Sequence, residues 1–417
     1  TVEAIAAANG ISDPRYISVG QRLLIPNARL DVPGAPITHS VVPGDTLRTL
    51  AAAYQTTTDR IAAANFITNP ARLFIGQELT INQGAAGEAS TTGQSRSLYR
   101  VQPGENVLRI ALRLGVPWRT LAEANGLTNC GPLFAGLRVW VPGGDGSPHD
   151  LPSPLISFTL TPTPAVQGKT LALHITTEGP ATLAGTFVGY PLQFVTHDGN
   201  QHEALFGVHA FTAAGVYPLA LSVTTPDGVQ TLLTFNVRVD DGNYGTEIIS
   251  LDTQQQDLLT TQVTEPEWEL VARTMSVFTA QRYFDGLMGL PSTGAITSQF
   301  GTRRAYNGGV LSTFHSGTDF GGAPGSPVLA PAAGVVVLAE SLPVRGNATI
   351  IDHGWGVVTG YWHQSEINVR VGDVVSAGQV IGAVGSTGRS TGPHLHWEMW
   401  VGGVQVDPMQ WVQQTFP

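Results

Sequence analysis

An internal repeat in the first third of the chain restricts its fold more than any other feature of the sequence. The segment YRVQPGEN at residues 99–106 follows the pattern of HSVVPGDT at residues 39–46, at an offset of 60 residues. An alanine-rich stretch ending in asparagine occurs three times, and a glycine follows each asparagine eleven residues later: Asn9 and Gly20, Asn65 and Gly76, Asn125 and Gly136. Because self-similarity at a fixed period indicates one structural unit copied along the chain, we expect an array of small modules here.

Each complete unit is predicted to fold as a strand, two helices and a second strand. The residues before the Pro-Gly pair form the first strand, and residues 47–54 have apolar side chains at helical spacing behind Thr46, a favourable helix N-cap. Residues 59–65 indicate the second helix, and a short apolar run closes the unit. The unit at residues 1–26 contains only the second helix and the last strand. We therefore expect an upstream piece, with any signal peptide, to be missing from this numbering.

Length and composition indicate a multidomain, mainly β protein. At 417 residues the chain exceeds one ordinary core and should form three or more domains. Only 12% of the residues are charged, while 49 glycines and 28 prolines favour strands and turns over long helices. The net charge of -10 argues against nucleic acid or an acidic membrane surface as the partner. The single cysteine, Cys130, excludes an intramolecular disulfide framework, and no apolar run approaches the roughly 20 residues of a membrane span.

The repeats resemble the lysin motif (LysM), through VVPGDTL and VQPGENV near the start of two units and through AN and IGQEL further on. The resemblance covers residues 39–82 and 99–142 in full and residues 1–26 in part. It implies binding to N-acetylglucosamine-containing polymers such as peptidoglycan or chitin, and tandem sites on a repetitive polymer would gain avidity. The alternative is that the repeats are spacers. Linkers rich in small residues or containing proline are expected at residues 83–98 and 143–154.

Residues 155–240 change character and predict a two-sheet sandwich. Apolar or alternating runs are separated by glycine, proline and Asp-Gly turns, a spacing typical of an immunoglobulin-like fold. The expected strands are residues 156–161, 170–176, 187–194, 204–208, 215–224 and 229–239. Four histidines in this segment share no spacing and are interpreted as ordinary structural or surface residues: His174, His197, His202 and His209. The domain itself is expected to be a spacer or a wall beside the substrate.

Residues 241–290 connect this sandwich to the C-terminal domain through one predicted helix. The helical pattern covers roughly residues 265–283, with Pro266 suited to the first helical turn. From residue 291 to residue 417 the chain returns to short apolar runs punctuated by glycine. These runs predict a compact antiparallel β domain with tight turns.

Metal-binding side chains are concentrated in this last domain. If HLHWE forms a strand, His394, His396 and Glu398 share one face at a spacing of about 6–7 Å. A histidine and an aspartate also occur in HSGTD at residues 315–319, and a further histidine in YWH at residues 361–363. Three separated segments therefore offer nitrogen and oxygen donors of the kind that zinc takes.

The available donors fit the needs of a zinc hydrolase. Such an enzyme needs three protein ligands, one open position for water, and nearby groups that transfer protons and stabilise an oxyanion. Asp319 and up to four histidines are available, and spacing alone leaves open which of them bind metal. HSGTD is not the helical zincin pattern, since Gly317 disfavours a helix and no adjacent glutamate base is present.

These segments resemble the three signature motifs of the lysostaphin-type peptidoglycan metalloendopeptidases. The motifs are HSGTD at residues 315–319, YWHQS at residues 361–365 and GPHLHWE at residues 392–398, with similar flanking segments at residues 298–303 and 328–334. The resemblance implies that His315, Asp319 and His396 bind one zinc ion with a catalytic water. It also implies that His363 and His394 are the catalytic histidines, and that one or both of them activate the water and stabilise the oxyanion.

The resemblance further implies a secreted zinc metalloendopeptidase, extracellular or in the cell envelope, that hydrolyses peptide cross-links of bacterial peptidoglycan in cell-wall remodelling or lysis. Stem peptides would enter the catalytic site while the LysM repeats hold the glycan. A similar sandwich is often found N-terminal to secreted peptidases of this family, and here it would set the reach. The alternative is a catalytically silent, wall-bound scaffold or amidase activator of the same architecture. Such relatives usually lose metal ligands or catalytic histidines, and this chain keeps all of them.

Several residues beside the motifs are expected to support the site. Glu398 is interpreted as the carboxylate that orients a histidine, and His353 as a turn residue near the site. Three aromatic side chains either pack or line a cleft, and packing is the simpler interpretation: Tyr361, Trp362 and Trp397. A latent form is a further hypothesis, in which the side-chain oxygen of Asn307 takes the position of the water.

Overall fold

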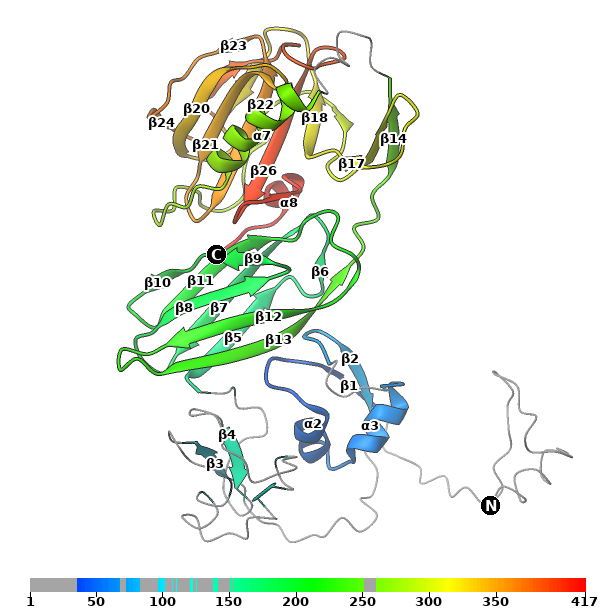
Figure 1. Ribbon diagram of the computed structural model, residues 1–417, viewed down its shortest axis with the longest axis vertical. Coiled ribbons are helices and arrows are strands. Elements are labelled where there is room, and N and C mark those ends of the chain that lie inside the picture. The colour runs from blue at the N-terminus through cyan, green and yellow to red at the C-terminus, as the bar shows by residue number, and fades with distance from the viewer. Residues whose placement is uncertain are drawn as a thin grey trace, which may run out of the picture. The chain divides into compact units, whose positions relative to one another are not determined.

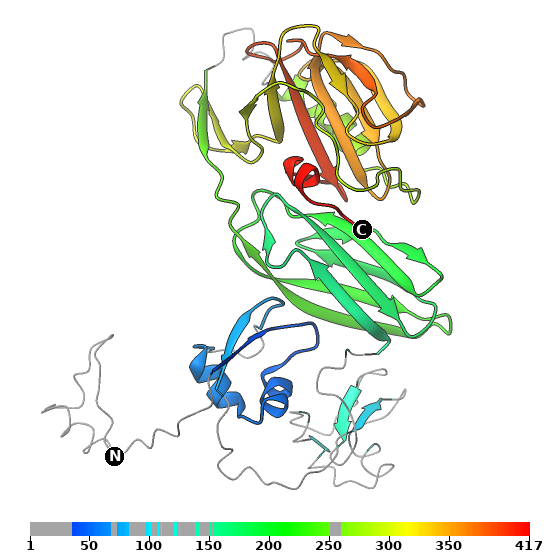
Figure 2. The ribbon, with the colours of Figure 1, turned by 180° about the vertical axis from the view of Figure 1, so that it is seen from behind.

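The computed structural model describes residues 36–67, 73–82, 97–101, 107, 110, 121–122, 125, 138–141, 151, 153–250 and 260–417. The incomplete repeat at residues 1–26 and most of the linkers predicted at residues 83–98 and 143–154 lie outside them. The described part is mainly β with few helices, as expected (Figure 1, Figure 2). None of its helices is long and apolar enough to cross a membrane.

The repeat at residues 39–82 has the predicted order of strand, helix, helix and strand. Its elements are β1 (Ile37–Ser40), α2 (Leu47–Ala53), α3 (Thr58–Ala64) and β2 (Glu78–Ile81), and β1 pairs antiparallel with β2. Thr46 caps α2 as expected: its hydroxyl accepts from the Thr49 N–H at 3.1 Å, and its own N–H donates to the Thr49 hydroxyl at 2.8 Å. Leu50 and Ile61 are fully buried. A helix cap and a small apolar core therefore hold the module together.

The repeat at residues 99–142 is described at its two strands and at a few positions between them. β3 (Ser97–Arg100) pairs antiparallel with β4 (Arg138–Val141), and β3 begins two residues before the expected boundary. Val101 and Val139 belong to a cluster of buried apolar side chains in this repeat. The two predicted strands are confirmed, and most of the predicted helical residues lie outside the described ones.

Residues 155–240 form two sheets with strand orders β10-β11-β7-β5 and β6-β13-β12-β8-β9, and apolar side chains from both share one core. The elements are β5 (Leu155–Thr161), β6 (Ala165–Val166), β7 (Thr170–Thr177), β8 (Thr182–Phe187), β9 (Tyr190–Leu192), β10 (Val195–His197), β11 (Gln201–Gly207), β12 (Gly215–Thr224) and β13 (Gln230–Asp240). The strand expected at residues 187–194 is confirmed only as the shorter β9, because β8 ends at Phe187 and the chain turns through Val188 (φ 49°) and Gly189 (φ 83°). Two left-handed central residues make a tight hairpin turn. The other expected strands are present within a few residues.

The connecting segment contains one strand and one helix. Its strand β14 (Thr246–Ile249) pairs parallel with β16 (Arg303–Tyr306), and β16 pairs antiparallel with β17 (Thr313–Phe314). Its helix is α7 (Thr261–Met275). The connector therefore contributes a strand to a small sheet of the C-terminal domain, beyond joining two domains.

The helix predicted at residues 265–283 is displaced towards the N-terminus in the structure. Pro266 lies at the sixth position of α7 instead of in its first turn, on an exposed side where the missing N–H is tolerated. The residues that follow α7 leave the helix because their backbone bonds elsewhere, for example the Tyr283 N–H to the His353 carbonyl at 2.9 Å. Tertiary contacts here override a local helical pattern.

One large sheet forms the C-terminal domain, in the order β15-β18-β26-β22-β21-β20-β24 with β27 paired to β26, and a smaller sheet has the order β19-β25-β23. The remaining elements are β15 (Ile296–Ser298), β18 (Gly317–Gly321), β19 (Pro327–Leu329), β20 (Gly334–Leu342), β21 (Gly346–Asp352), β22 (Val357–Gln364), β23 (Glu366–Ile367), β24 (Val374–Val375), β25 (Val380–Ala383), β26 (His394–Val401), β27 (Val404–Val406) and α8 (Met409–Gln413). The pairings within both sheets are antiparallel, which confirms the predicted antiparallel β domain.

The large sheet separates two apolar cores. Successive residues of β26 point to opposite faces, so Leu395 and Trp397 join the larger core whereas Trp400 joins a second core beneath α7. Val271 and Met275 of α7 are fully buried in that second core, and Figure 1 shows α7 lying across β20, β21 and β22. The even-numbered residues of β26, which include the expected zinc ligand of this strand, therefore lie on the same face of the sheet as α7.

Candidate metal centre

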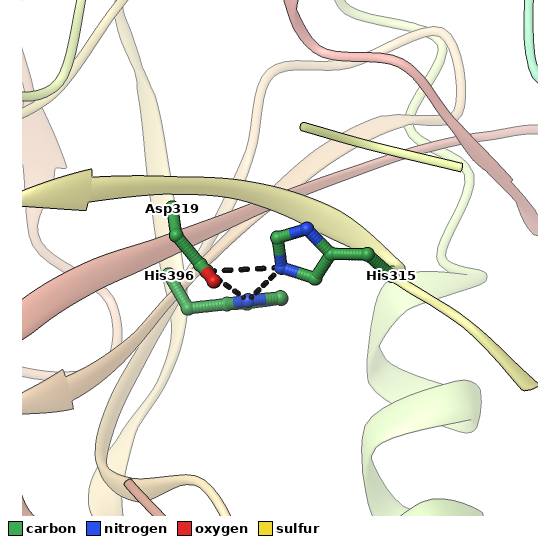
Figure 3. Close-up of side chains that lie close together, drawn as sticks. All are labelled: His315, Asp319 and His396. Carbon is green, nitrogen blue, oxygen red and sulfur yellow. Dashed lines mark hydrogen bonds and ion pairs between the residues drawn. The ribbon is translucent and has the colours of Figure 1, made fainter. Parts of the chain in front are cut away.

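Strand pairing brings the three expected metal ligands together. Asp319 on β18 lies directly opposite His396 on β26, and His315 precedes β18 by two residues. His315 Nε2 lies 2.9 Å from Asp319 Oδ1 and 2.9 Å from His396 Nδ1, and His396 Nδ1 lies 2.7 Å from Asp319 Oδ1 (Figure 3). All three residues are buried. Three ligand-type atoms therefore surround one point, where a metal ion could be held.

The other ring nitrogen of each histidine has a partner that fixes its tautomer. His315 Nδ1 lies 3.0 Å from the carbonyl oxygen of Gln299, which can only accept, so Nδ1 carries the proton. His396 Nε2 likewise donates to Glu398 Oε1 at 3.2 Å. His315 Nε2 and His396 Nδ1 are then the ring nitrogens that would face a cation together with the Asp319 carboxylate. This donor set fits a divalent cation with a preference for nitrogen and oxygen ligands, such as zinc.

His363 and His394 lie beside this cluster. Their ring centroids are 4.9 Å apart, and His394 Nε2 lies 3.8 Å from Asp319 Oδ1. Each donates Nδ1–H to a backbone carbonyl, His363 to Thr387 at 2.8 Å and His394 to Gly392 at 2.7 Å. The Nε2 atom of each ring therefore keeps a lone pair that can accept a proton.

A β-bulge turns His363 toward the cluster. In the β21–β22 pair the register shifts between Asn347 and Thr349, so that β22 has one residue more than its partner. His363 has a left-handed backbone with φ of 63°, an unfavourable conformation for a residue other than glycine. Strict alternation would place His363 on the face opposite Trp362. Its ring centroid instead lies 6.3 Å from that of His396.

Burial and charge set the protonation of the cluster. Burial lowers the pKa of His315 to about 4 and that of His363 to about 3, so both rings are neutral near pH 7. Burial opposes ionisation of Asp319, but His396 and His315 outweigh it and hold the pKa of this carboxyl below its usual range. The pKa of His396 is raised, because the negative charge of Asp319 outweighs burial. Arg304 Nη2 lies 3.5 Å from Asp319 Oδ2 and leaves Oδ1 for the cluster.

Other residues named from the sequence fall into two groups. Glu398 is buried against His396, as expected for a carboxylate that orients a histidine. His353 lies in the turn between β21 and β22, at the opposite end of β22 from His363, and is not near the cluster. Its Nδ1 lies 2.7 Å from the Ala333 carbonyl oxygen and its Nε2 lies 2.7 Å from the Thr359 hydroxyl, so its contacts are structural.

The three motif aromatics pack, and one also lines a cavity. Tyr361 and Trp397 are fully buried in the larger core, and Trp362 is buried in the second core while also reaching the cavity beside the cluster. Asn307 is exposed in the turn after β16 and is not among the described residues that line this cavity. The hypothesis that its side chain takes the position of the water therefore receives no support from the structure.

Three of the four sandwich histidines are structural or surface residues, as expected. His174 and His197 lie 3.2 and 3.4 Å from Glu203 oxygens, and buried His202 contacts the hydroxyls of Thr177 and Thr196. His209 is the exception, because it lines the cavity described next.

A cavity of about 1090 Å³ lies over the cluster, and its lining includes the Asp319 and His396 side chains. The sequence motifs did not indicate three of its wall residues, which come from separate elements: Trp268 of α7, Phe211 of the sandwich and Arg304 of β16. Trp268 and Phe211 are 44% and 46% exposed. Exposed aromatic side chains beside a polar centre are typical of ligand sites, so the sandwich serves as a wall of the cavity.

Comparisons with known proteins match two different parts of the chain to two families. Residues 313–408 match the description Peptidase family M23, and residues 1–26, 39–82 and 99–142 match the LysM domain. Peptidoglycan DD-endopeptidase ShyA of Vibrio cholerae serotype O1 is 44% identical over 115 residues, 28% of this chain and 27% of that protein. DD-carboxypeptidase/endopeptidase Mpg of Neisseria meningitidis serogroup B is 44% identical over 116 residues, 27% of this chain and 26% of that protein.

The match to a solved structure is similarly local. The catalytic domain of lysostaphin from Staphylococcus simulans is 32% identical and covers 34% of this chain and 98% of that chain, with a TM-score of 0.24. The chain spans about a quarter of the length of the curated relatives it matches. The segment matched to Peptidase family M23 contains the three C-terminal motifs, and the segments matched to LysM contain the repeats. The chain therefore carries a peptidase domain of family M23 together with LysM repeats.

Proposed function

We propose that this protein is a zinc metalloendopeptidase that hydrolyses peptide cross-links of bacterial peptidoglycan. In this proposal His315, Asp319 and His396 hold one zinc ion, and His363 and His394 are the catalytic histidines. The observation that carries it is the arrangement of three buried ligand-type atoms within 2.9 Å of one another, with an acceptor behind the other ring nitrogen of each histidine.

When bound, zinc would lower the pKa of a water molecule and polarise the scissile carbonyl. The residues around it perform the remaining tasks. His363 and His394 carry their protons on Nδ1, so Nε2 of either ring can accept the proton of the attacking water and return it to the leaving amine. The protonated ring could then donate to the developing oxyanion. Arg304 beside Asp319 Oδ2 orients that carboxylate so that Oδ1 faces the cluster.

The relatives support the choice of substrate. ShyA is named a peptidoglycan DD-endopeptidase and Mpg a DD-carboxypeptidase/endopeptidase. We extend peptidoglycan stem peptides to this chain as the substrate, with the LysM repeats at residues 39–82 and 99–142 holding N-acetylglucosamine-containing glycan. Such a substrate implies secretion to the envelope or beyond. The sandwich at residues 155–240 would then be an immunoglobulin-like domain that sets the reach of the catalytic domain, from residue 291 onward.

The alternative of a catalytically silent scaffold or amidase activator gains no support from a specific observation. A silent relative would be expected to lack a ligand or a catalytic histidine. All five residues are present here, and a ring nitrogen of each of His315, His394 and His396 lies within 4 Å of Asp319 Oδ1.

The test combines metal analysis with digestion of purified peptidoglycan. The parent should contain one zinc per chain and should release fragments with new peptide ends, detected by mass spectrometry. His363→Ala and His394→Ala should retain the fold and lose release by a factor of about 100 or more. His174→Ala, on the sandwich, is the matched control and should digest as the parent does. A parent that holds zinc but creates no new peptide ends would show that the proposal is wrong.

Glycan binding by the repeats needs its own measurement. The full chain should be retained on insoluble peptidoglycan or chitin more strongly than a chain that begins at residue 153, because tandem sites add avidity. Equal retention of the two chains on both polymers would leave the repeats as spacers.

A further inference from the structure

A buried network of charges runs from α7 to the metal centre. Glu267 of α7 is 4% exposed and Glu398 of β26 is 2% exposed. Arg345, in the turn between β20 and β21, lies between these two carboxylates: its Nη1 is 3.0 Å from Glu267 Oε1 and its Nη2 is 3.9 Å from Glu398 Oε1. Buried charges need partners, so the three side chains depend on one another.

At one end of the network Glu398 holds a metal-ligand candidate. Its Oε1 accepts from His396 Nε2 at 3.2 Å and from the Ser316 hydroxyl at 2.7 Å, while its Oε2 accepts from the Trp400 indole at 2.9 Å. This carboxylate cannot rotate without losing one of these bonds. Its position therefore sets the direction of the His396 Nδ1 lone pair.

At the other end Glu267 closes the turn that precedes β21. Its Oε2 accepts from the Val344 N–H at 2.6 Å and its Oε1 from the Arg345 N–H at 3.1 Å. The carbonyls of the same turn bind the catalytic segments: that of Arg345 accepts from the His363 N–H at 2.8 Å, and that of Val344 accepts from the Arg389 N–H at 2.8 Å. One side chain of α7 thus fixes the turn that holds the bulged residue His363.

Aromatic rings keep Arg345 in place. Its guanidinium carbon lies 5.2 Å from the centre of the Trp362 ring and 5.9 Å from that of the Trp268 ring, and its side chain is only 14% exposed. Cation–π contacts of this kind are favourable when the cation is shielded from water. The guanidinium is therefore confined to the space between the two carboxylates.

We propose that α7 is part of the metal centre, with Glu267 and Arg345 as positioning residues for His396 and His363. The residues that match the peptidase family begin at 313, so α7 lies outside them. The inference rests on the proposed function for the roles of the two histidines. Arg345 and Glu398 are among the residues that line the cavity, whereas Glu267 is not among the described residues that do, so a change at Glu267 tests positioning without altering the cavity wall.

Glu267→Gln is the informative change. Glutamine keeps one oxygen for a backbone N–H of the turn but removes the charge that balances Arg345. Among the described residues, Arg345 then has Glu398 as its only charged partner and competes with the His396 N–H for that carboxylate. We expect the dissociation constant for zinc, measured by chelator competition on the full chain, to rise about 10-fold or more. The kcat for peptidoglycan fragments should fall while KM stays within about twofold.

Glu269→Gln is the matched control. It makes the same chemical change two residues along α7 at an exposed position, and its zinc dissociation constant should equal that of the parent. Arg345→Lys is a second variant, in case Glu267→Gln does not fold. Lysine keeps the positive charge but lacks the fork that spans two carboxylates, so zinc should again bind about 10-fold more weakly.

The two proposals fail in different ways. The positioning role is overturned if Glu267→Gln and Arg345→Lys bind zinc with the same dissociation constant as Glu269→Gln. This holds even if their unfolding temperature falls, because a purely structural role would lower stability alone. A parent that binds zinc with the expected difference between variants, yet cleaves nothing, would overturn the proposed function and leave the positioning role intact.

Discussion

Gly317 in the HSGTD motif is the position where the smallest substitution should do the most damage to the metal centre. It lies on β18 directly opposite Glu398 on β26. A Cβ atom built on Gly317 would lie 2.3 Å from the Trp397 carbonyl oxygen and 2.8 Å from His396 Nε2. The glycine is therefore required by the close approach of a neighbouring strand and of a metal-ligand candidate.

The geometry gives the size of the effect of Gly317→Ala. An ordinary contact begins near 3.4 Å, so β18 and β26 must separate by about 1 Å at this point. Overpacking of a closely packed site costs about 1–3 kcal/mol in stability. Zinc sites tolerate deviations of only about 0.2 Å in ligand distance. The contact with His396 Nε2 falls about 0.6 Å short of that distance, so the ring must also move, and we expect a loss of zinc affinity of about 10- to 100-fold.

The assay is chelator competition for zinc together with urea unfolding of the full chain. Gly322→Ala is the matched control, since a Cβ atom there meets nothing closer than Val384 Cγ1 at 3.5 Å. Gly322→Ala should bind zinc as the parent does. If Gly317→Ala binds zinc as tightly as Gly322→Ala, close packing against His396 does not maintain the site and the reasoning is refuted.

Three further predictions concern stability. Burial lowers the pKa of His353 from 6.5 to about 4. The unfolded chain then binds an extra proton between these values, so stability is intact above pH 6.5 and falls by about 3 kcal/mol as the pH drops to 4. His353→Gln should lack this part of the pH dependence in urea titrations followed by tryptophan fluorescence, and an unchanged dependence would contradict it. Met275→Ala, in the core beneath α7, should cost about 2–5 kcal/mol, whereas exposed Glu269→Ala should stay within about 0.5 kcal/mol. Chelation should lower the unfolding temperature of the parent, and zinc at a thousandfold excess over its dissociation constant should restore about 4 kcal/mol; no response to chelator would argue against a bound metal.

Periodicity in the sequence predicts those modules that are held together by contacts between residues close in the sequence. The LysM unit at residues 39–82 follows from a repeat, an N-cap at Thr46 and apolar spacing, and all of these act within a few residues. Most sandwich strands follow from alternation in the same way. The prediction fails where the chain responds to distant contacts: α7 ends at Met275 because the residues after it bond to the turn at His353. The spacing of apolar residues in a helix does not predict such a contact.

Within the site, strand alternation correctly placed His394, His396 and Glu398 on one face. It would have placed His363 on the wrong face, because a bulge and a left-handed backbone turn this residue toward the cluster. Only the resemblance of YWHQS to a family motif pointed to its role. No sequence motif indicates the role of Arg345, since this role arises from two carboxylates that are distant in the sequence.

The metal centre also depends on residues that precede the segment matching the peptidase family. The acceptor that fixes the tautomer of His315 is the carbonyl of Gln299, and the charge that holds Arg345 in place belongs to Glu267. A chain of residues 313–408 would contain all three ligand candidates but neither of these two partners. Since a metal-bound histidine is oriented by the group that accepts the N–H of its other ring nitrogen, we infer that the shortest chain with full zinc affinity begins at α7 and not at the first motif.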